Sequence, residues 1–479
     1  MISFIISILV LIIGYFTYGK LVENIFGVQE HRKTPAISLR DDVDYMPLST
    51  WRVFMIQFLN IAGLGPIFGA IAGAMYGPAA FLWIVLGSIF AGAVHDYFSG
   101  MLSVRHDGLS ISEIVGIYLG PKVKHVMRFF TIILLIFVGT VFLVGPAKII
   151  DGMMGNQWGV WIWVSIILVY YILSTLLPID KLISRLYPIF GIAMLIMALG
   201  LLSALFFGDY QIPELIPENL SNMTTNPEET PLFPMLFVTI ACGAISGFHA
   251  TQSPLMARCI KNEKLGRKIF FGTMITEGIV ALIWAAAAMT FFGNVGELNA
   301  AMLENNNNAA WAANEISLNM LGGIGGILAL LGIVAAPITS GDTAFRSARL
   351  ILSDIFKLKQ TKIKNRLYLS LPLFMIAFVL TQMDFGVIWR YFSWSNQTLA
   401  TVVLWTITAY LIYENKAFWI TMIPAIFMTM VCSTYILIAP EGFQLANDLA
   451  YIGGSLITLC ITILFWIYTT KEKKVFAYL

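Results

Sequence analysis

The stretch TIACGAISGFHATQSPLMAR, residues 239–258, is apolar enough to enter a bilayer but is crowded with residues that interrupt helices. It contains two glycines, a proline and four residues that seek hydrogen bonds: Gly243, Gly247, Pro254, His249, Thr251, Gln252 and Ser253. Unpaired backbone groups are costly in hydrocarbon, so irregular backbone is tolerated there only against protein or a watery cavity. The stretch therefore predicts a broken helix that lines a binding site.

A second stretch of the same kind lies earlier, NIAGLGPIFGAIAGAMYG at residues 60–77. Its apolar run is interrupted by Gly63, Gly65, Pro66, Gly69 and Gly73. Glycines four residues apart also let ordinary helices pack closely, and for each glycine alone that alternative is the stronger one. The nearby prolines favour broken helices in both stretches.

The composition defines the class of protein. Of the 479 residues, 58% are hydrophobic and 12% are charged, whereas a soluble domain has about 25% charged residues. Long apolar blocks of this kind are typical of a multi-pass membrane protein.

The sequence lacks a basic patch with interleaved aromatic residues, so nothing in it indicates nucleic acid as a partner. The four cysteines lack C-x-x-C spacing, and we interpret them as small buried hydrophobes rather than disulfide or metal ligands.

A helix needs about 20 apolar residues to cross a bilayer. Thirteen segments meet this requirement: 2–19, 53–76, 79–104, 126–147, 158–177, 186–207, 234–257, 271–292, 318–350, 367–383, 386–412, 417–438 and 448–469. The first lacks the features of a cleaved signal peptide, so we expect a true span. The ninth is too long for a simple span and is expected to be tilted, broken or extended into the cytoplasm.

The basic residues predict the orientation, because loops rich in Lys and Arg stay in the cytoplasm. With the N-terminus outside, every Lys and Arg except Lys148 and Arg390 falls in or beside a cytoplasmic loop or the C-terminal tail. The outward loops 208–233 and 293–317 contain acids and no Lys or Arg. We therefore expect a multi-pass protein of the inner, cytoplasmic membrane with its C-terminus in the cytoplasm.

The two broken spans open two sets of five spans, and an odd number inverts the second set relative to the first. This predicts one all-α transmembrane domain, 1–479, with a LeuT-like five-plus-five inverted-repeat core of about 13 helices. The first repeat is 53–207 and the second 234–412, flanked by an extra helix, 2–19, and two C-terminal helices, 417–469. Such a pattern indicates a secondary transporter with its substrate near the membrane midplane.

Helix N-termini at the breaks carry partial positive charge and suit a carboxylate. We therefore predict the substrate-binding residues Gly63, Gly65, Gly69, Gly243, Gly247, His249, Thr251 and Gln252. No catalytic and no metal-binding residue is predicted.

Ionisable residues inside spans are expensive and are functional candidates. GAVHDYFSG places His95 and Asp96 in the third span. Adjacent residues point about 100° apart on a helix, so at least one is expected to meet another span. A structural polar contact is an equal alternative for Asp96.

The ninth span contains AAPITSGDTAFRSARL, whose oxygen-bearing side chains suit Na⁺, while its carboxylate alone could carry a proton. By analogy with the LeuT-type fold, this span shares a sodium site with the first broken helix. A salt bridge from Asp342 to Arg346 is an equal alternative. With Asp96, the predicted ion-coupling residues are Thr339, Ser340, Asp342 and Thr343; no cofactor is expected beyond a coupling H⁺ or Na⁺.

Several long motifs resemble the carbon starvation protein A (CstA) family. They are RDDVDYMP at 40–47, the run from GPIFGAIAGAMYG to SISEIVG, CGAISGFHA at 242–250, GDTAFRSAR and SNQTLA. The resemblance covers residues 40–412 and implies an inner-membrane transporter of peptides, or of pyruvate with protons, in the amino acid–polyamine–organocation superfamily. The chain is shorter than the larger members of the family, and ITSGDTAFRSAR differs in sequence from their Asp-containing motif. The resemblance therefore leaves substrate and coupling ion open.

We thus expect a secondary active transporter that imports a small carboxylate-bearing nutrient, pyruvate or short peptides, coupled to H⁺ or Na⁺. A passive channel is the first alternative. A membrane-embedded enzyme is less favoured, because the sequence has no H-E-x-x-H and no G-x-S-x-G motif. The oligomeric state is not predicted.

Overall fold

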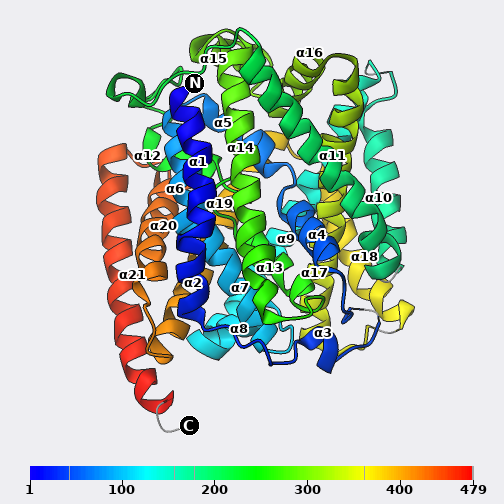
Figure 1. Cartoon of the computed structure of the whole chain (residues 1–479), viewed down its shortest axis with the longest axis vertical. Helices are drawn as coiled ribbons and strands as arrows, with labels where there is room; N and C mark the ends of the chain where they lie inside the picture. Colours follow the sequence, from blue (N-terminus) through cyan, green and yellow to red (C-terminus); the bar gives the residue numbers. More distant parts are fainter. Residues whose placement is uncertain (43, 156, 177–178, 361, 477–479) are drawn as a thin grey trace.

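A computed structural model describes residues 1–42, 44–155, 157–176, 179–360 and 362–476; the side chains of 176–186, 324 and 474–476 lie outside the description. Within these ranges all regular secondary structure is helical, which confirms the all-α prediction. Figure 1 shows the long helices running side by side, with the N-terminus at one end of the bundle and the C-terminus at the other.

The main elements of the first half are α1 (Ile2–Phe16), α2 (Tyr18–Phe26), α3 (Pro35–Ser38), α4 (Thr50–Ile61), η1 (Gly65–Gly69), α5 (Ala70–Ala74), α6 (Ala79–Gly87), η2 (Ser88–Gly92), α7 (Ala93–Arg105), α8 (Ile111–Leu119), α9 (Pro121–Met153), α10 (Val160–Leu176) and α11 (Ile179–Phe207). Those of the second half are α12 (Leu232–Thr239), α13 (Gly247–Ala257), η5 (Arg267–Phe271), α14 (Gly272–Phe291), α15 (Val295–Glu304), α16 (Ala309–Ala329), η6 (Leu330–Ala335), α17 (Ala336–Phe356), α18 (Ile363–Leu380), α19 (Phe385–Tyr413), α20 (Trp419–Ile438) and α21 (Asn447–Phe476).

All thirteen predicted segments fall on helix. In the described part of the chain, nine helices are long and apolar enough to cross a membrane, or ten if one bent pair counts as a single span. The remaining segments correspond to the shorter α10, the broken α12 and α13, and the more polar α19. The helical membrane fold is confirmed, and the count of thirteen spans stays a prediction.

The ninth predicted segment is interrupted, as its length requires. Gly322 in α16 adopts φ 61° and ψ −147°, a conformation that only glycine reaches without strain. The π-helix η6 then widens the backbone before Pro337 in the first turn of α17. Because proline cannot donate an intrahelical hydrogen bond, a π-helical turn beside it is a common way to absorb the irregularity.

The centre of the bundle is formed by α9 packed against α17, with α7 against α13 and α14 against η1 and α5. The N-terminal α1 packs on α14, while α20 covers α19 and α21 lies outside α20, at the left edge of Figure 1. The two broken helices are therefore enclosed by other helices, which places their irregular backbone against protein.

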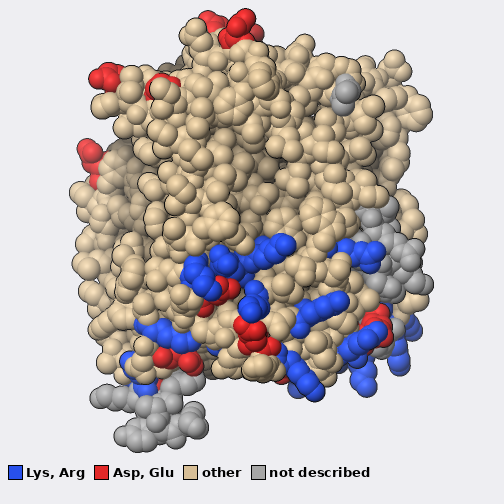
Figure 2. All heavy atoms as spheres, viewed as in Figure 1, with Lys and Arg blue, Asp and Glu red and all other residues tan. Residues whose placement is uncertain are grey.

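The charged residues separate along the bundle. In the view of Figure 2, Lys and Arg gather in the half near α3, α8 and the C-terminus. The opposite end, where α15 and the N-terminus lie, shows acidic groups and no basic ones. Between these ends the visible surface is almost free of charge, as a lipid-facing surface must be.

Candidate functional site

Two helix breaks lie inside the bundle. The first separates α4, which ends at Ile61, from η1, which begins at Gly65, and the chain bends there by 53°. The second is longer, because α12 ends at Thr239 and α13 begins at Gly247, with irregular backbone between them. Both breaks fall within the stretches predicted to be broken, at Gly63 and Gly243, although Pro254 lies inside α13.

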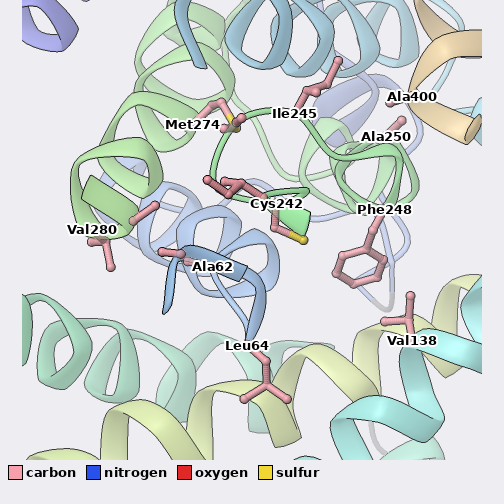
Figure 3. Packing of buried hydrophobic residues seen from close by; sticks show 14 of the residues in the cluster. Ala62, Leu64, Val138, Cys242, Ile245, Phe248, Ala250, Met274, Val280 and Ala400 are labelled. Atoms are coloured by element: carbon pink, nitrogen blue, oxygen red, sulfur yellow. The ribbon is translucent and has the colours of Figure 1, made fainter. Parts of the chain in front are cut away.

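The two breaks touch, and their glycines are the points of closest approach. A Cβ placed on Gly65 would lie 2.2 Å from Cys242 Cβ, and one on Gly69 would lie 3.0 Å from the Thr239 carbonyl oxygen. Cys242 in the second break thus lies against the first, whose Ala62 and Leu64 are labelled with it in Figure 3. Close packing, the alternative considered for each glycine, therefore operates here together with the breaks.

The other three predicted glycines also meet neighbours too closely for any side chain. A Cβ would lie 2.8 Å from the Phe142 ring at Gly63, 2.7 Å from Ala281 Cβ at Gly243, and 2.4 Å from the Asn396 carbonyl oxygen at Gly247. These glycines bring the first break to α9, the second break to α14, and the start of α13 to α19.

Side chains from neighbouring helices pair the backbone groups that the second break frees. Trp83 Nε1 donates to the Ile240 carbonyl at 3.1 Å, and Ser88 Oγ donates to the Gly243 carbonyl at 3.0 Å. The Phe248 amide, at the start of α13, donates to Asn396 Oδ1 at 2.7 Å. The break is therefore compatible with a membrane interior. The N-terminus of α13 is capped by a protein amide, which any substrate carboxylate at this position has to replace.

Four ionisable side chains form a fully buried cluster beside the second break. Asp96 on α7 accepts at both oxygens: Nδ1 of His95 lies 2.8 Å from Oδ1, and Nδ1 of His249 on α13 lies 2.8 Å from Oδ2. The other ring nitrogen of His249, Nε2, lies 3.5 Å from Oε2 of Glu277 on α14. All four side chains have no exposed surface.

This cluster joins three spans through His249. A bond between Nε2 of His249 and Glu277 requires one proton between them, and a doubly protonated His249 can donate to Asp96 and to Glu277 at once. The presence or absence of that proton therefore changes the attraction between α13 and α14.

Sequence reasoning found His249 and Asp96 and expected Asp96 or His95 to meet another span. It did not select Glu277, whose side chain is fully buried. It also took His95 and Asp96 to point apart, but the His95 ring turns back to its neighbour. The signal that could have found the cluster is the presence of four ionisable residues in apolar segments.

Thr251 and Gln252 follow His249 on α13 and are buried. Thr251 Oγ1 donates to the Phe248 carbonyl at 2.7 Å, and Gln252 Nε2 donates to Thr251 Oγ1 at 2.9 Å and to Ser347 Oγ on α17 at 3.4 Å. These bonds tie α13 to the ninth predicted span. They leave Gln252 Oε1 without a hydrogen-bond partner among the described residues.

The predicted ion-coupling residues of α17 point in two directions. Ser340 Oγ donates to the Leu59 carbonyl in α4 at 3.0 Å, so it faces the first broken helix. Asp342 faces α10 and α11, where its Oδ2 accepts from Ser174 Oγ at 2.6 Å and from the Tyr187 hydroxyl at 3.0 Å. The Thr339 and Thr343 hydroxyls donate to carbonyls of their own helix. Of these four residues, Ser340 is the one that is hydrogen-bonded to a broken helix among the described residues, and Asp342 does not belong to the Asp96 cluster.

A cavity of about 200 Å³ opens at the end of the bundle that carries α15 and α16. Its walls come from both broken helices and from α19: Phe68, Ala72, Val238, Thr239, Phe385, Trp389, Arg390 and Ser393 are among the lining residues. Arg390 Nε donates to Glu441 Oε2 at 3.2 Å. The cavity thus lies at the acidic end of the molecule, against the halves of both broken helices that face that end.

Aromatic rings separate this cavity from the breaks. Trp389 in the cavity wall contacts Phe392, with ring centroids 5.5 Å apart, and Phe392 contacts Phe142 at 6.2 Å. Phe142 in turn meets Phe248, in the first turn of α13, at 6.0 Å. A stack of contacting side chains therefore closes the route from the cavity to the start of α13.

Apolar helices, broken spans and a buried ionisable cluster define a multi-pass membrane protein. Its fold resembles that of a solved manganese transporter from Eremococcus coleocola, with a TM-score of 0.56 and 12% identity over 92% of this chain and 99% of the other. The chain belongs to the family described as carbon starvation protein CstA, whose sequence model matches residues 1–162 and 153–384.

Relatives of the chain include proteins named as transporters. An uncharacterized membrane protein of Haemophilus influenzae is 44% identical over 61% of this chain and 92% of its own length. The peptide transporter CstA of Bacillus subtilis is 26% identical over 83% of each chain. The pyruvate/proton symporter BtsT of Escherichia coli is 25% identical over 59% of this chain and 48% of its own length.

Proposed function

We propose that the protein is a secondary active transporter that imports a small carboxylate-bearing nutrient, pyruvate or a short peptide, coupled to an ion. The observation that carries this proposal is the buried ion pair between His249 on the second broken helix and Asp96 on α7. A titratable pair held on a movable half-helix can link ion binding to the movement that exposes a substrate site. The names of the relatives supply the two substrate classes.

Helix packing supports the predicted inverted repeat of spans 53–207 and 234–412. Within each set, the broken helix packs on the last helix: α4 on α11, and α13 on α19. Between the sets, the second span of each set packs on the broken helix of the other set: α7 contacts α13, and α14 contacts α5. The third helices pair as α9 with α17, and the fourth as α10 with α18. Exchanging the two sets keeps these pairings of whole spans, although α4 precedes the first break and α13 follows the second.

The charge distribution supports an orientation in the inner membrane. The basic end, with α3 and α8, is the cytoplasmic end in this proposal, and the acidic end with α15 is the outside. The N-terminus is then outside and the C-terminus in the cytoplasm. The 200 Å³ cavity opens to the outside, which suits entry of a nutrient.

The buried cluster favours the proton as the coupling ion. Imidazole is the side chain that exchanges protons near neutral pH, and His249 has a carboxylate at each ring nitrogen. A proton between His249 and Glu277 strengthens the attraction between α13 and α14, and its loss weakens it. In this proposal, proton binding holds α13 in one position and proton release frees it, so that the two repeats rock around the site.

Sodium is the second candidate, and one contact favours it. Ser340 Oγ and the Leu59 carbonyl lie 3.0 Å apart where α17 meets the first broken helix. Hydroxyl and carbonyl oxygens at such a junction are hard ligands that suit Na⁺. In this alternative, Thr339 and Thr343 would supply further oxygens only after their hydroxyls leave the carbonyls of α17.

The substrate carboxylate is proposed to bind at the start of α13. There the backbone amide of Phe248 meets Asn396 Oδ1, and a carboxylate oxygen can take the place of that amide oxygen. The route from outside passes the aromatic contacts of Trp389, Phe392 and Phe142. Displacement of these rings would open the cavity to the two breaks.

The test is uptake of labelled pyruvate and labelled dialanine into proteoliposomes, with an inward proton gradient and separately an inward Na⁺ gradient. Accumulation above equilibrium under one gradient supports the proposal and identifies the ion. Equilibration without accumulation supports a passive channel. If neither compound enters faster than into empty liposomes, the proposed function is wrong.

A further inference from the structure

The C-terminal end of α4 carries two buried carboxamides that form no hydrogen bond within the described part of the protein. Gln57 and Asn60 have no exposed surface, and they lie three residues apart, on one face of the helix. Both the nitrogen and the oxygen of each amide lack a hydrogen-bond partner in the described part of the chain. Two whole amides left unpaired within one turn are unusual, because unpaired buried polar groups are strongly destabilising.

A comparable buried amide elsewhere in the protein has hydrogen-bond partners for both its oxygen and its nitrogen. Asn396 on α19 is also without exposed surface. Its Oδ1 accepts from the Phe248 amide at 2.7 Å and from Ser246 Oγ at 3.1 Å, and its Nδ2 donates to Ser246 Oγ at 3.0 Å. At Gln57 and Asn60, in contrast, both the nitrogen and the oxygen of the amide lack a partner among the described residues.

The position of the two amides links them to the first break. Asn60 is the penultimate residue of α4, directly before the irregular backbone at Ala62. The neighbouring Leu59 carbonyl is already taken by Ser340 Oγ. On the other side, α4 packs against α13, whose Gln252 also has an unpaired buried oxygen. Three amide oxygens and two amide nitrogens without protein partners thus belong to two packed helices, one from each broken span.

We propose that Gln57 and Asn60 form a cargo-binding amide pair at the first break, a site that rests on the transport function proposed above. A carboxamide offers donors and acceptors together, so the pair is complementary to cargo that presents N–H donors beside carbonyl or carboxylate acceptors. Amino acids and short peptides have this character. Pyruvate carries acceptors alone and would leave the oxygens of Gln57, Asn60 and Gln252 unpaired.

The proposal predicts discrimination between cargo with and without N–H donors. A site built to hydrogen-bond an N–H group rejects an analogue that lacks it, because the buried oxygen then stays unpaired. We expect dialanine to compete for uptake at least about tenfold better than pyruvate, and alanine, which is similar in size to pyruvate, also better than pyruvate. This preference disappears if the site recognises the carboxylate alone.

The test uses Gln57→Met and Asn60→Leu, which keep the side-chain size and remove the amide. A third variant, Gln57→Asn, keeps the amide but shortens the side chain by one methylene. Gln382→Met is the matched control, because Gln382 is an exposed amide at the end of α18. Uptake of labelled dialanine and labelled pyruvate into proteoliposomes is measured for each variant, together with the thermal unfolding temperature of the purified protein.

The amide-pair assignment predicts a loss of dialanine uptake of at least about tenfold in Gln57→Met and Asn60→Leu, with an unchanged or higher unfolding temperature. Gln382→Met keeps full uptake. Unchanged dialanine uptake, or a loss of uptake that follows a loss of stability, overturns the assignment. If the unaltered protein accumulates pyruvate but not dialanine, the assignment fails while the transport function stands; if it accumulates neither, both fail.

Discussion

Nδ1 of His249 lies 2.8 Å from Oδ2 of Asp96, and this contact joins the second broken helix to α7 in the fully buried centre of the molecule. A buried ion pair of this kind is weak support for stability, because desolvation offsets much of its attraction. We therefore expect its main effect on transport.

Replacing Asp96 by asparagine keeps the size of the side chain and removes its charge. The proton on His249 then loses the nearer of its two carboxylate neighbours and keeps Glu277 at 3.5 Å, so the coupling of a proton gradient to movement of α13 should weaken. We expect proton-driven accumulation to fall at least about tenfold, while exchange of labelled for unlabelled cargo continues. Exchange and accumulation measured in the same proteoliposomes separate coupling from binding. Asp96→Asn protein that accumulates cargo normally would assign the pair a structural role.

Replacing His249 by glutamine should have the same effect, and it should also weaken cargo binding, since His249 lies in the first turn of α13. The control is His125→Gln, at an exposed position of α9. Uptake as a function of outside pH distinguishes the two histidines: the pH dependence should disappear with His249→Gln and persist with His125→Gln. A pH profile retained by His249→Gln would move the proton site elsewhere.

Gly65 should tolerate no side chain, because its Cβ would lie 2.2 Å from Cys242 Cβ. We expect Gly65→Ala to destabilise the protein by about 1–3 kcal/mol, the typical effect of overpacking. Removing the opposing Cβ with Cys242→Gly should restore part of the loss, measured by thermal unfolding. Gly152→Ala is the control, since no atom lies within 4 Å of a Cβ there. Equal stability of Gly65→Ala and Gly152→Ala would show that the breaks do not touch.

Asn396 should be needed for the second break, because its oxygen pairs the Phe248 amide. Asn396→Leu leaves that buried N–H unpaired, which costs about 1–3 kcal/mol. Asn396→Asp keeps the acceptor and should be less destabilising at the start of α13, where a negative charge is favoured. Thermal unfolding of both variants gives the comparison. A Leu variant as stable as the Asp variant would mean that the amide is paired in another way.

Substitutions at and beside Asp342 test the alternative that Na⁺ is the coupling ion. Asp342→Asn should abolish Na⁺-driven accumulation if this carboxylate serves the coupling ion, and should leave proton-driven accumulation intact if the Asp96 cluster does. Tyr187→Phe removes one hydrogen bond to Asp342 but keeps its charge, so it separates a structural effect from an ionic one. Uptake under each gradient, for each variant, decides between the two ions.

Much of the fold follows from the sequence, because hydrocarbon imposes simple rules. Apolar length predicts the helices, the placement of Lys and Arg predicts which ends share a side, and Gly–Pro clusters predict the breaks at 62–64 and 240–246. The interruption before α17 could be expected from length alone, but not its form as a π-helix, since that depends on how the helix packs around Pro337.

The site was less accessible from the sequence. His249 and Asp96 could be selected as ionisable residues in spans, but their pairing depends on α7 lying against α13. Glu277 and the Gln57–Asn60 pair have no motif that marks them, and their significance comes from burial together with missing partners. Asp342 and Ser340 were grouped because both carry oxygen ligands, whereas the structure directs them to different helices.

The most direct test of proton coupling through His249 and Asp96 is cargo-driven proton entry. Proteoliposomes containing a pH-sensitive dye are given dialanine or pyruvate outside, with no ion gradient imposed. We predict that the lumen acidifies as cargo enters through the unaltered protein, and that Asp96→Asn protein exchanges cargo without acidification. Cargo entry without acidification in the unaltered protein, or acidification at the same rate in Asp96→Asn, would contradict the account.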